Sequence, residues 1–259
     1  MLWIQRGLLI LVLVFAALTT WLALEMRQYP PPENVELPNG FKTPILALEF
    51  PRNSDDLLVV LDPENERMLA HLYVVQLIDE YFPWAYGGLL TSFLASVMFM
   101  LWRQYHDRRI GAVIMVPLLA FLAYSVINGD FVENQAINQA ITTLSEFDDS
   151  QQAIATLDRR ADVITRAAWH KWTMIGAMIA LVSLVMVVAR YRILAGLVSI
   201  PTLATLYARF LDPSGPAIEF MAQAIAVFFL AIPLMAVYFL VQSFRRTESP
   251  DESPRQVES

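Results

Sequence analysis

Residues 62–109 read DPENERMLAHLYVVQLIDEYFPWAYGGLLTSFLASVMFMLWRQYHDRR, and this stretch decides the class of the protein. Asp62 can cap a helix that begins at Pro63, where a missing N–H costs nothing. The helical pattern leads into a predominantly apolar run, residues 84–102, which at about 1.5 Å per residue matches the thickness of a bilayer's hydrocarbon core. A basic cluster follows at once: Arg103, Arg108 and Arg109. We therefore predict an element that leads from a polar surface through a membrane to a positively charged side.

The composition supports a membrane protein. Hydrophobic residues make up 56% of the 259 residues, and they occur in runs too long to pack into one soluble core. The net charge is −7 and no basic stripe suited to nucleic acid is present, so we expect the lipid bilayer, and not a nucleic acid, as a partner. Cysteine is absent, which excludes disulfides, thiolate metal sites and a cysteine nucleophile.

The fold class predicted from the apolar runs is an all-α, polytopic transmembrane helical bundle with six spans. We place these spans at about residues 7–24, 84–102, 110–128, 168–189, 193–211 and 217–241. The six tryptophans all lie at predicted span ends, as is typical of aromatic belts. Residues 1–243 form a single membrane domain in this prediction. Residues 244–259 are charged and rich in serine and proline, which predicts a disordered tail.

The segments between the spans are predicted to be mostly helical. Thr43-Pro44 can start a short helix that ends before Pro51 and is too short to cross a membrane, so we expect it to rest on the membrane surface. Ser54 is expected to cap a second short helix. The helical pattern of the third span continues to about residue 145, and one helix is expected from residue 151 to about 192. Spans 2, 3 and 4 would therefore extend beyond the bilayer side by side.

The orientation follows from basic residues near the span ends. The residues on one side are Arg6, Arg103, Arg108, Arg109, Arg190, Arg192, Arg245 and Arg246. By the positive-inside rule this side faces the cytoplasm. The predicted location is the cell inner membrane, with both termini and the 244–259 tail in the cytoplasm. Residues 25–83 and 129–167 would then be extracytoplasmic.

Charged residues gather where the predicted spans meet the extracytoplasmic side. The candidate cluster comprises Glu49, Asp79, Asp130, Glu133, Asn134 and Lys171. Asp130, Glu133 and Asn134 are spaced i, i+3, i+4 and share one helix face. Adjacent helices would bring all six residues to one depth. The cluster is either an interfacial ion-pair network or a ligand, ion or proton site, because unpaired charges near hydrocarbon tend to pair or to line a wet cavity.

The chain carries no motif of a known catalytic or metal site. Its three histidines are His71, His106 and His170, and His170 alone lies at the depth of the cluster, so no metal site is predicted. No nucleophile elbow, HExxH, P-loop or GxGxxG is present, and we predict no catalytic residue and no cofactor.

Two functions remain open at this point. The first is a non-enzymatic binding, sensing or assembly component that acts through its extracytoplasmic helices on another membrane or extracytoplasmic protein. The second is a small-solute or lipid-handling transporter or enzyme that uses the carboxylate–lysine cluster. A sealed, fully paired cluster would favour the first, and a cavity that reaches the cluster would favour the second.

Five short motifs between Pro44 and Arg190 follow one another in a characteristic order: ILALEF, IDEYFPWAY, DRRIG, VENQA and HKW. In this order the chain resembles a broad group of uncharacterised bacterial integral membrane proteins. It departs from that group in its longer extracytoplasmic stretch and its additional spans. The resemblance implies that Glu49, Asp79, Glu133 and Lys171 belong to one constellation, and it implies no reaction.

Overall fold

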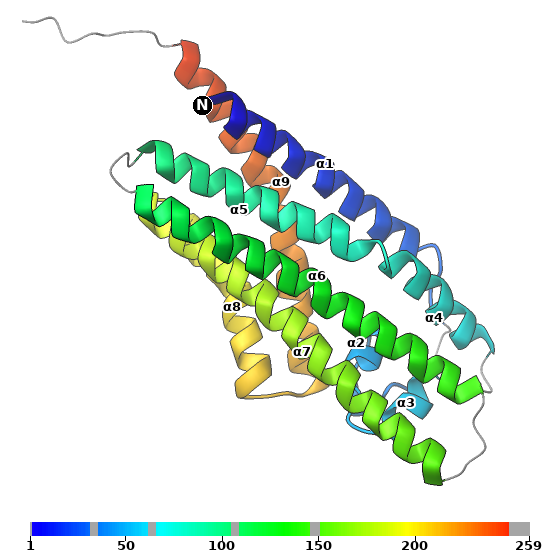
Figure 1. Ribbon diagram of the computed structural model, residues 1–259. Coiled ribbons are helices and arrows are strands. Elements are labelled where there is room, and N and C mark those ends of the chain that lie inside the picture. The colour runs from blue at the N-terminus through cyan, green and yellow to red at the C-terminus, as the bar shows by residue number, and fades with distance from the viewer. Residues whose placement is uncertain (1, 32–35, 62–65, 105–108, 146–150, 249–259) are drawn as a thin grey trace, which may run out of the picture.

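The computed structural model describes residues 2–31, 36–61, 66–104, 109–145 and 151–248, and within them the chain is all-helical, as predicted (Figure 1). The helices are α1 (Leu2–Met26), η1 (Pro38–Gly40), α2 (Pro44–Glu49), α3 (Ser54–Leu61), α4 (Glu66–Asp79), α5 (Phe82–Gln104), α6 (Arg109–Ser145), α7 (Gln151–Val188), α8 (Arg192–Phe210) and α9 (Gly215–Glu248).

Five of these helices are long and apolar enough to cross a membrane: α1, α5, α7, α8 and α9. The chain is therefore a multi-pass membrane protein, and the first, second, fourth, fifth and sixth predicted spans fall in these helices. The third predicted span, residues 110–128, falls in α6. Because the side chains of residues 102–116 lie outside the described part of the chain, that span stays a prediction.

The two longest helices, α6 and α7, pack along each other and organise the bundle (Figure 1). They contain 37 and 38 residues, which corresponds to about 55 Å each, against roughly 30 Å for the hydrocarbon core of a bilayer. Each is therefore longer than one crossing of a bilayer requires. Helix α7 ends at Val188, earlier than predicted, because Arg190 adopts a positive φ of 69° and the Tyr191 N–H returns to the Met186 carbonyl.

Helices α4 and α5 are separate, although the sequence pattern appeared continuous to Tyr81. Glu80 and Tyr81 form a turn between them, and Pro83 lies in the first turn of α5, where its missing N–H costs no helical hydrogen bond. Helix α4 contacts α1, α3 and α5. The predicted Asp62-Pro63 helix start lies outside the described residues.

The short helix α2 begins at Pro44 as predicted, but it lies inside the bundle and not on a membrane surface. All of its residues except Ile45 are buried. The next helix, α3, is capped by Asn53 and not by Ser54, since the Asn53 side-chain oxygen accepts the Asp56 N–H at 3.0 Å. The Ser54 N–H instead donates to Asp158 of α7 at 2.7 Å, which fixes α3 on α7.

The C-terminal helix corrects one further prediction. Helix α9 continues to Glu248, so residues 244–248 of the predicted disordered tail are helical, and residues 249–259 lie outside the described part. Arg6 of α1 donates to the Ser243 side chain at 3.2 Å and to its carbonyl at 2.8 Å. This contact joins α1 to the C-terminal half of α9. From it the two helices diverge toward the end of the bundle that carries α2 and α3 (Figure 1).

Candidate functional site

Helices α6 and α7 approach closely where the candidate cluster lies. A Cβ atom added at Gly129 would come within 3.3 Å of the Cα of Lys171 and 3.2 Å of the His170 ring. Glycine at this position therefore lets the two helix backbones approach, since any larger residue would contact the opposite main chain. Asp130 follows Gly129 directly, and Glu133 lies one turn later on the same helix. Both carboxylates consequently face Lys171.

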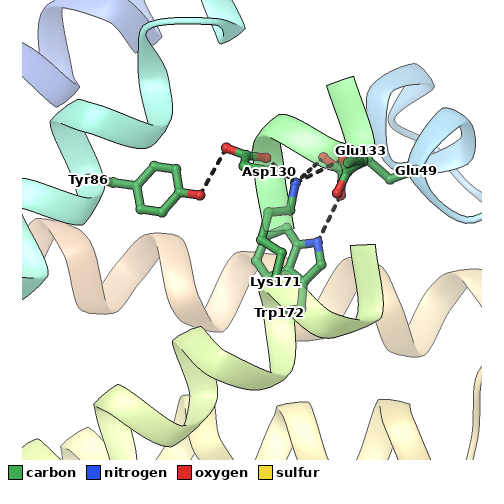
Figure 2. Close-up of polar contacts among 6 residues, drawn as sticks. All are labelled: Glu49, Tyr86, Asp130, Glu133, Lys171 and Trp172. Atoms are coloured by element: carbon green, nitrogen blue, oxygen red, sulfur yellow. Dashed lines mark hydrogen bonds and ion pairs between the residues drawn. The ribbon is translucent and has the colours of Figure 1, made fainter. Parts of the chain in front are cut away.

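Lys171 is the centre of a buried ion-pair cluster (Figure 2). Its Nζ atom lies 2.8 Å from Asp130 Oδ1, 2.9 Å from Glu133 Oε1 and 3.1 Å from Glu49 Oε1. All four residues are buried, with Lys171 only 5% exposed. Three carboxylates from α2 and α6 thus share one ammonium from α7, which ties three helices together.

Two aromatic side chains complete the hydrogen bonding of the carboxylates. The indole N–H of Trp172 donates to Glu49 Oε2 at 2.8 Å, and the Tyr86 hydroxyl donates to Asp130 Oδ2 at 2.9 Å (Figure 2). Glu133 differs, because its Oε2 atom is buried and has no hydrogen-bond partner in the part of the chain that the structure describes. A buried acceptor of this kind is normally satisfied by water or by a proton. The cluster is therefore paired but not saturated.

Glu219, in the first turns of α9, holds the other end of α2. Its Oε1 atom accepts the Lys42 and Thr43 N–H groups at 2.9 and 2.8 Å, and its Oε2 atom accepts the Thr43 hydroxyl at 2.9 Å. Close contact between Gly215 and the carbonyl of Asn39 brings the start of α9 against η1. Helix α2 is thereby fixed at its start by Glu219 and at its end by Glu49.

Asp79, the last residue of α4, lies at the edge of the cluster. It is half-buried, and within the described part of the chain it makes no ion pair. Burial, reinforced by the Asp130 carboxylate, raises the pKa of Asp79 from 3.8 to about 7, against the smaller opposing effect of Lys171. The Asn134 amide also opposes the rise. It is close enough to favour the ionised carboxylate, although its geometry falls short of a hydrogen bond.

A cavity of about 540 Å³ reaches the cluster. Its walls come from α1, α2, α4, α5, α6, α7 and α9. The charged side chains that line it are Arg27, Glu49, Asp79, Asp130, Lys171 and Glu219, and the aromatic ones are Phe82, Tyr86, Trp172 and Phe229. Most of the remaining lining is aliphatic. The cavity therefore has an acidic, aromatic part and an apolar part.

A second hollow, of about 450 Å³, lies on the other side of the α4–α5 break, and we call it the polar groove. It is lined by Glu80, Tyr81, Trp84, Phe131, Asn134, Gln135, Asn138, Gln139 and Thr142. Its α6 wall is thus rich in side-chain amides, which offer both donors and acceptors. Asp79 faces the cavity, whereas Glu80 and Tyr81 face the groove. The turn between α4 and α5 consequently forms the partition between the two hollows.

The structure brings Glu49, Asp130, Glu133 and Lys171 into direct contact, and it leaves two other candidates of the sequence-based set outside that contact. Asp79 is near the cluster without joining the ion pairs, and Asn134 faces Asp79 and the polar groove, not Lys171. The candidate cluster predicted from the sequence does not include Tyr86, Trp172 and Glu219. Both Tyr86 and Trp172 stand inside quoted motifs, IDEYFPWAY and HKW, but only Trp172 is next to a charged residue, Lys171, so that adjacency was the available signal. Glu219 stands at the start of the sixth predicted span, where a solvated side chain is expected, but its carboxylate is buried and bonded to the start of α2.

No family model, no curated protein and no solved structure matches this chain. The resemblance to bacterial integral membrane proteins therefore stays a prediction, and the site is interpreted from its own geometry.

Proposed function

We propose that this chain is a multi-pass protein of the cell inner membrane that binds an amphiphile with a positively charged headgroup in the cavity beside Lys171. The observation that carries the proposal is the cavity itself, because it reaches Glu49, Asp79, Asp130 and Lys171. A cluster that served only to hold the helices together would not need an accessible hollow beside it. The cavity therefore favours a small-solute or lipid-handling function over action through the outer helices alone.

The charge of the cavity favours a cation. Four carboxylates and two cationic side chains line it, and Lys171 is already shared among Glu49, Asp130 and Glu133. Asp79 remains as a carboxylate without an ion pair. The rings of Tyr86 and Phe229 stack with 6.0 Å between their centroids, and the Phe82 ring centroid lies 5.8 Å from that of Tyr86. Aromatic faces next to carboxylates bind ammonium groups, and quaternary ammonium groups in particular.

The apolar part of the ligand has two surfaces available. The cavity is bounded by aliphatic residues such as Ile45, Ile175 and Ala226. A further apolar hollow of about 630 Å³ lies between α8 and α9, and Gln223 lines both hollows. A ligand whose headgroup lies near Asp79 can therefore extend an alkyl chain along α9. This arrangement suits a lipid-like molecule better than a small polar solute.

The orientation and span number belong to the same proposal. Arginines near the span ends, among them Arg6, Arg190 and Arg192, support cytoplasmic termini. With six spans, the cluster, α2, α3 and α4 would lie on the extracytoplasmic side. The ligand would then be taken from the outer leaflet. Binding alone needs no enzymatic step, and we propose none.

Calorimetric titration of the full-length protein in phosphatidylglycerol nanodiscs tests this function. The probes are dodecyltrimethylammonium, dodecyl sulfate and dodecyl glucoside, which share a chain and differ in headgroup charge. We expect saturable binding of the cationic probe only, after subtraction of binding to empty nanodiscs. Glu49→Gln should weaken it, and the matched control Asp55→Asn, an exposed carboxylate of α3, should not. Equal binding of the sulfate probe, or no saturable binding at all, would refute the proposal.

A further inference from the structure

We propose that Asp79 is a proton-exchange site. A cationic ligand that enters the cavity displaces the proton of Asp79, and this proton leaves past Asn134 into the polar groove. This inference rests on the proposed function. It adds a second ligand, the proton, and the route by which that proton leaves the site. The geometry of two hollows separated by one helix break carries it.

Asp79 is the group of the cluster that is placed for such an exchange. It lines the cavity and, among the described residues, it has no ion-pair partner, whereas each oxygen of Glu49 and Asp130 already accepts a hydrogen bond. An ionised Asp79 in this setting adds a further negative charge to a buried group of carboxylates. Either a proton or an external cation can neutralise the Asp79 carboxylate, but the two cannot be bound to it at the same time.

Near the partition formed by the α4–α5 turn, several buried polar atoms have no hydrogen-bond partner among the described residues. Both amide atoms of Asn134 and both of Gln76 are in this state, and so is Glu133 Oε2. Gln76 precedes Asp79 by one helical turn, and Asn134 lines the groove while it faces Asp79. Buried polar groups are almost always satisfied, by protein or by ordered water. We infer that water occupies this partition and that it links Asp79 to the groove.

The ionisable groups around Asp79 come from every helix that packs on it. Asp130 on α6 and Glu49 on α2 disfavour a second negative charge, and Lys171 on α7 favours it. Glu219 of α9 and Arg27 at the end of α1 line the same cavity, and Glu80 follows Asp79 in the turn. Burial acts in the same sense as the carboxylates. The protonated form is therefore the resting form at mildly acidic pH.

The exchange balances in charge and atoms. The neutral Asp79 carboxyl group loses its O–H proton to water in the partition, and the carboxylate that remains pairs with the ammonium group of the ligand. The total charge of the site is unchanged. Since one proton is released for each cation bound, cation binding must tighten as the pH rises, by up to about tenfold per pH unit below the pKa of Asp79.

Proton release upon binding tests this inference directly. Dodecyltrimethylammonium is the probe because it carries no titratable proton. Release is measured with a pH indicator dye in weakly buffered nanodisc samples, and independently by calorimetry in buffers of different ionisation enthalpy. We expect close to one proton per bound probe at about pH 6 and almost none at about pH 8.5, where Asp79 is already ionised. Asp55→Asn should behave as the wild type does.

The failures of the two proposals are distinguishable. Absence of saturable binding at both pH values overturns the proposed function. Binding with no proton release at about pH 6, or with release that is equal at both pH values, overturns the exchange and leaves the function standing. The route has its own readout: Asn134→Leu should slow proton release at least about tenfold in stopped-flow measurements at about pH 6, while close to one proton per bound probe is still released. Unchanged kinetics would refute the route through Asn134.

Discussion

Gly129 packs directly against the backbone of Lys171, with 3.3 Å between the Lys171 Cα and the position that a Cβ of Gly129 would occupy. This close approach of α6 and α7 thus lies beside the buried ion pairs of Lys171. The distance between α6 and α7 sets the length of the ion pairs, because the Asp130 and Glu133 side chains must reach from the α6 backbone to the Nζ atom of Lys171 on α7. Helix packing and electrostatics are therefore coupled at this point.

Gly129→Val should destabilise the protein by about 1–3 kcal/mol, since a branched side chain would press on the α7 main chain. The matched control is Gly196→Val on α8, where an added Cβ meets no heavy atom within 4 Å. The measurement is thermal unfolding in detergent, followed by circular dichroism. Equal melting temperatures for the two variants would contradict the close packing.

Lys171→Met should lower the apparent melting temperature strongly, because it strands Glu49, Asp130 and Glu133 without a cation. Removal of one partner from a buried pair costs about 3–5 kcal/mol. Arg166→Met is the control, because Arg166 pairs with Asp162 on the exposed surface of the same helix, where ion pairs are worth about 0–1 kcal/mol. A Lys171→Met protein as stable as the Arg166→Met protein would show that the cluster is not structural.

Glu219→Leu should release the start of α2. The substitution removes three acceptor contacts and leaves the Lys42 and Thr43 N–H groups unpaired. Hydrogen–deuterium exchange across residues 39–50 should therefore become faster, while exchange in the central part of α7 stays unchanged. Glu219→Gln retains an acceptor oxygen and should show a smaller effect. Identical exchange in the wild type and Glu219→Leu would exclude this anchoring role.

Asp79 should make stability depend on pH. Burial raises the pKa of Asp79 from its ordinary value of 3.8 to about 7, so between these values the folded state holds a proton that the unfolded state has lost. The contribution of this group is therefore most favourable below about pH 4 and declines as the pH rises to about 7. The melting temperature of Asp79→Asn, measured at several pH values, should therefore change less with pH than that of the wild type or of Asp55→Asn. An unaltered pH dependence would refute the shift.

The proposed topology can be tested with single cysteines, because the native chain has none. Cysteines at Asn39 and Ser214 should react with a membrane-impermeant thiol reagent in intact cells. A cysteine at Gln104 should react only after lysis. Labelling of position 104 in intact cells would reverse the proposed orientation.

The sequence by itself determined the all-helical class, the position of five apolar helices and the short helix at Pro44. These properties depend on residues that are close in the chain: the length of an apolar run and a proline in the first turn of a helix. It also indicated that Lys171 and several carboxylates would share one depth, since each stands near the end of a predicted span. The depth of a residue in the membrane depends on its distance along the helix from the span end, and this distance can be counted in the sequence.

Only the tertiary structure decided which of these groups touch. The sequence patterns of Asp79 and Glu49 are equally suggestive, yet Glu49 pairs with Lys171 and Asp79 does not, because α2 is buried in the bundle and α4 ends at a break. Glu219 lies 170 residues from Glu49 in the chain, and only packing makes both of them anchors of α2. The cavity and the polar groove likewise exist only between helices. Rotation about helix axes and the exact end of α4 arise from long-range packing, which no local pattern encodes.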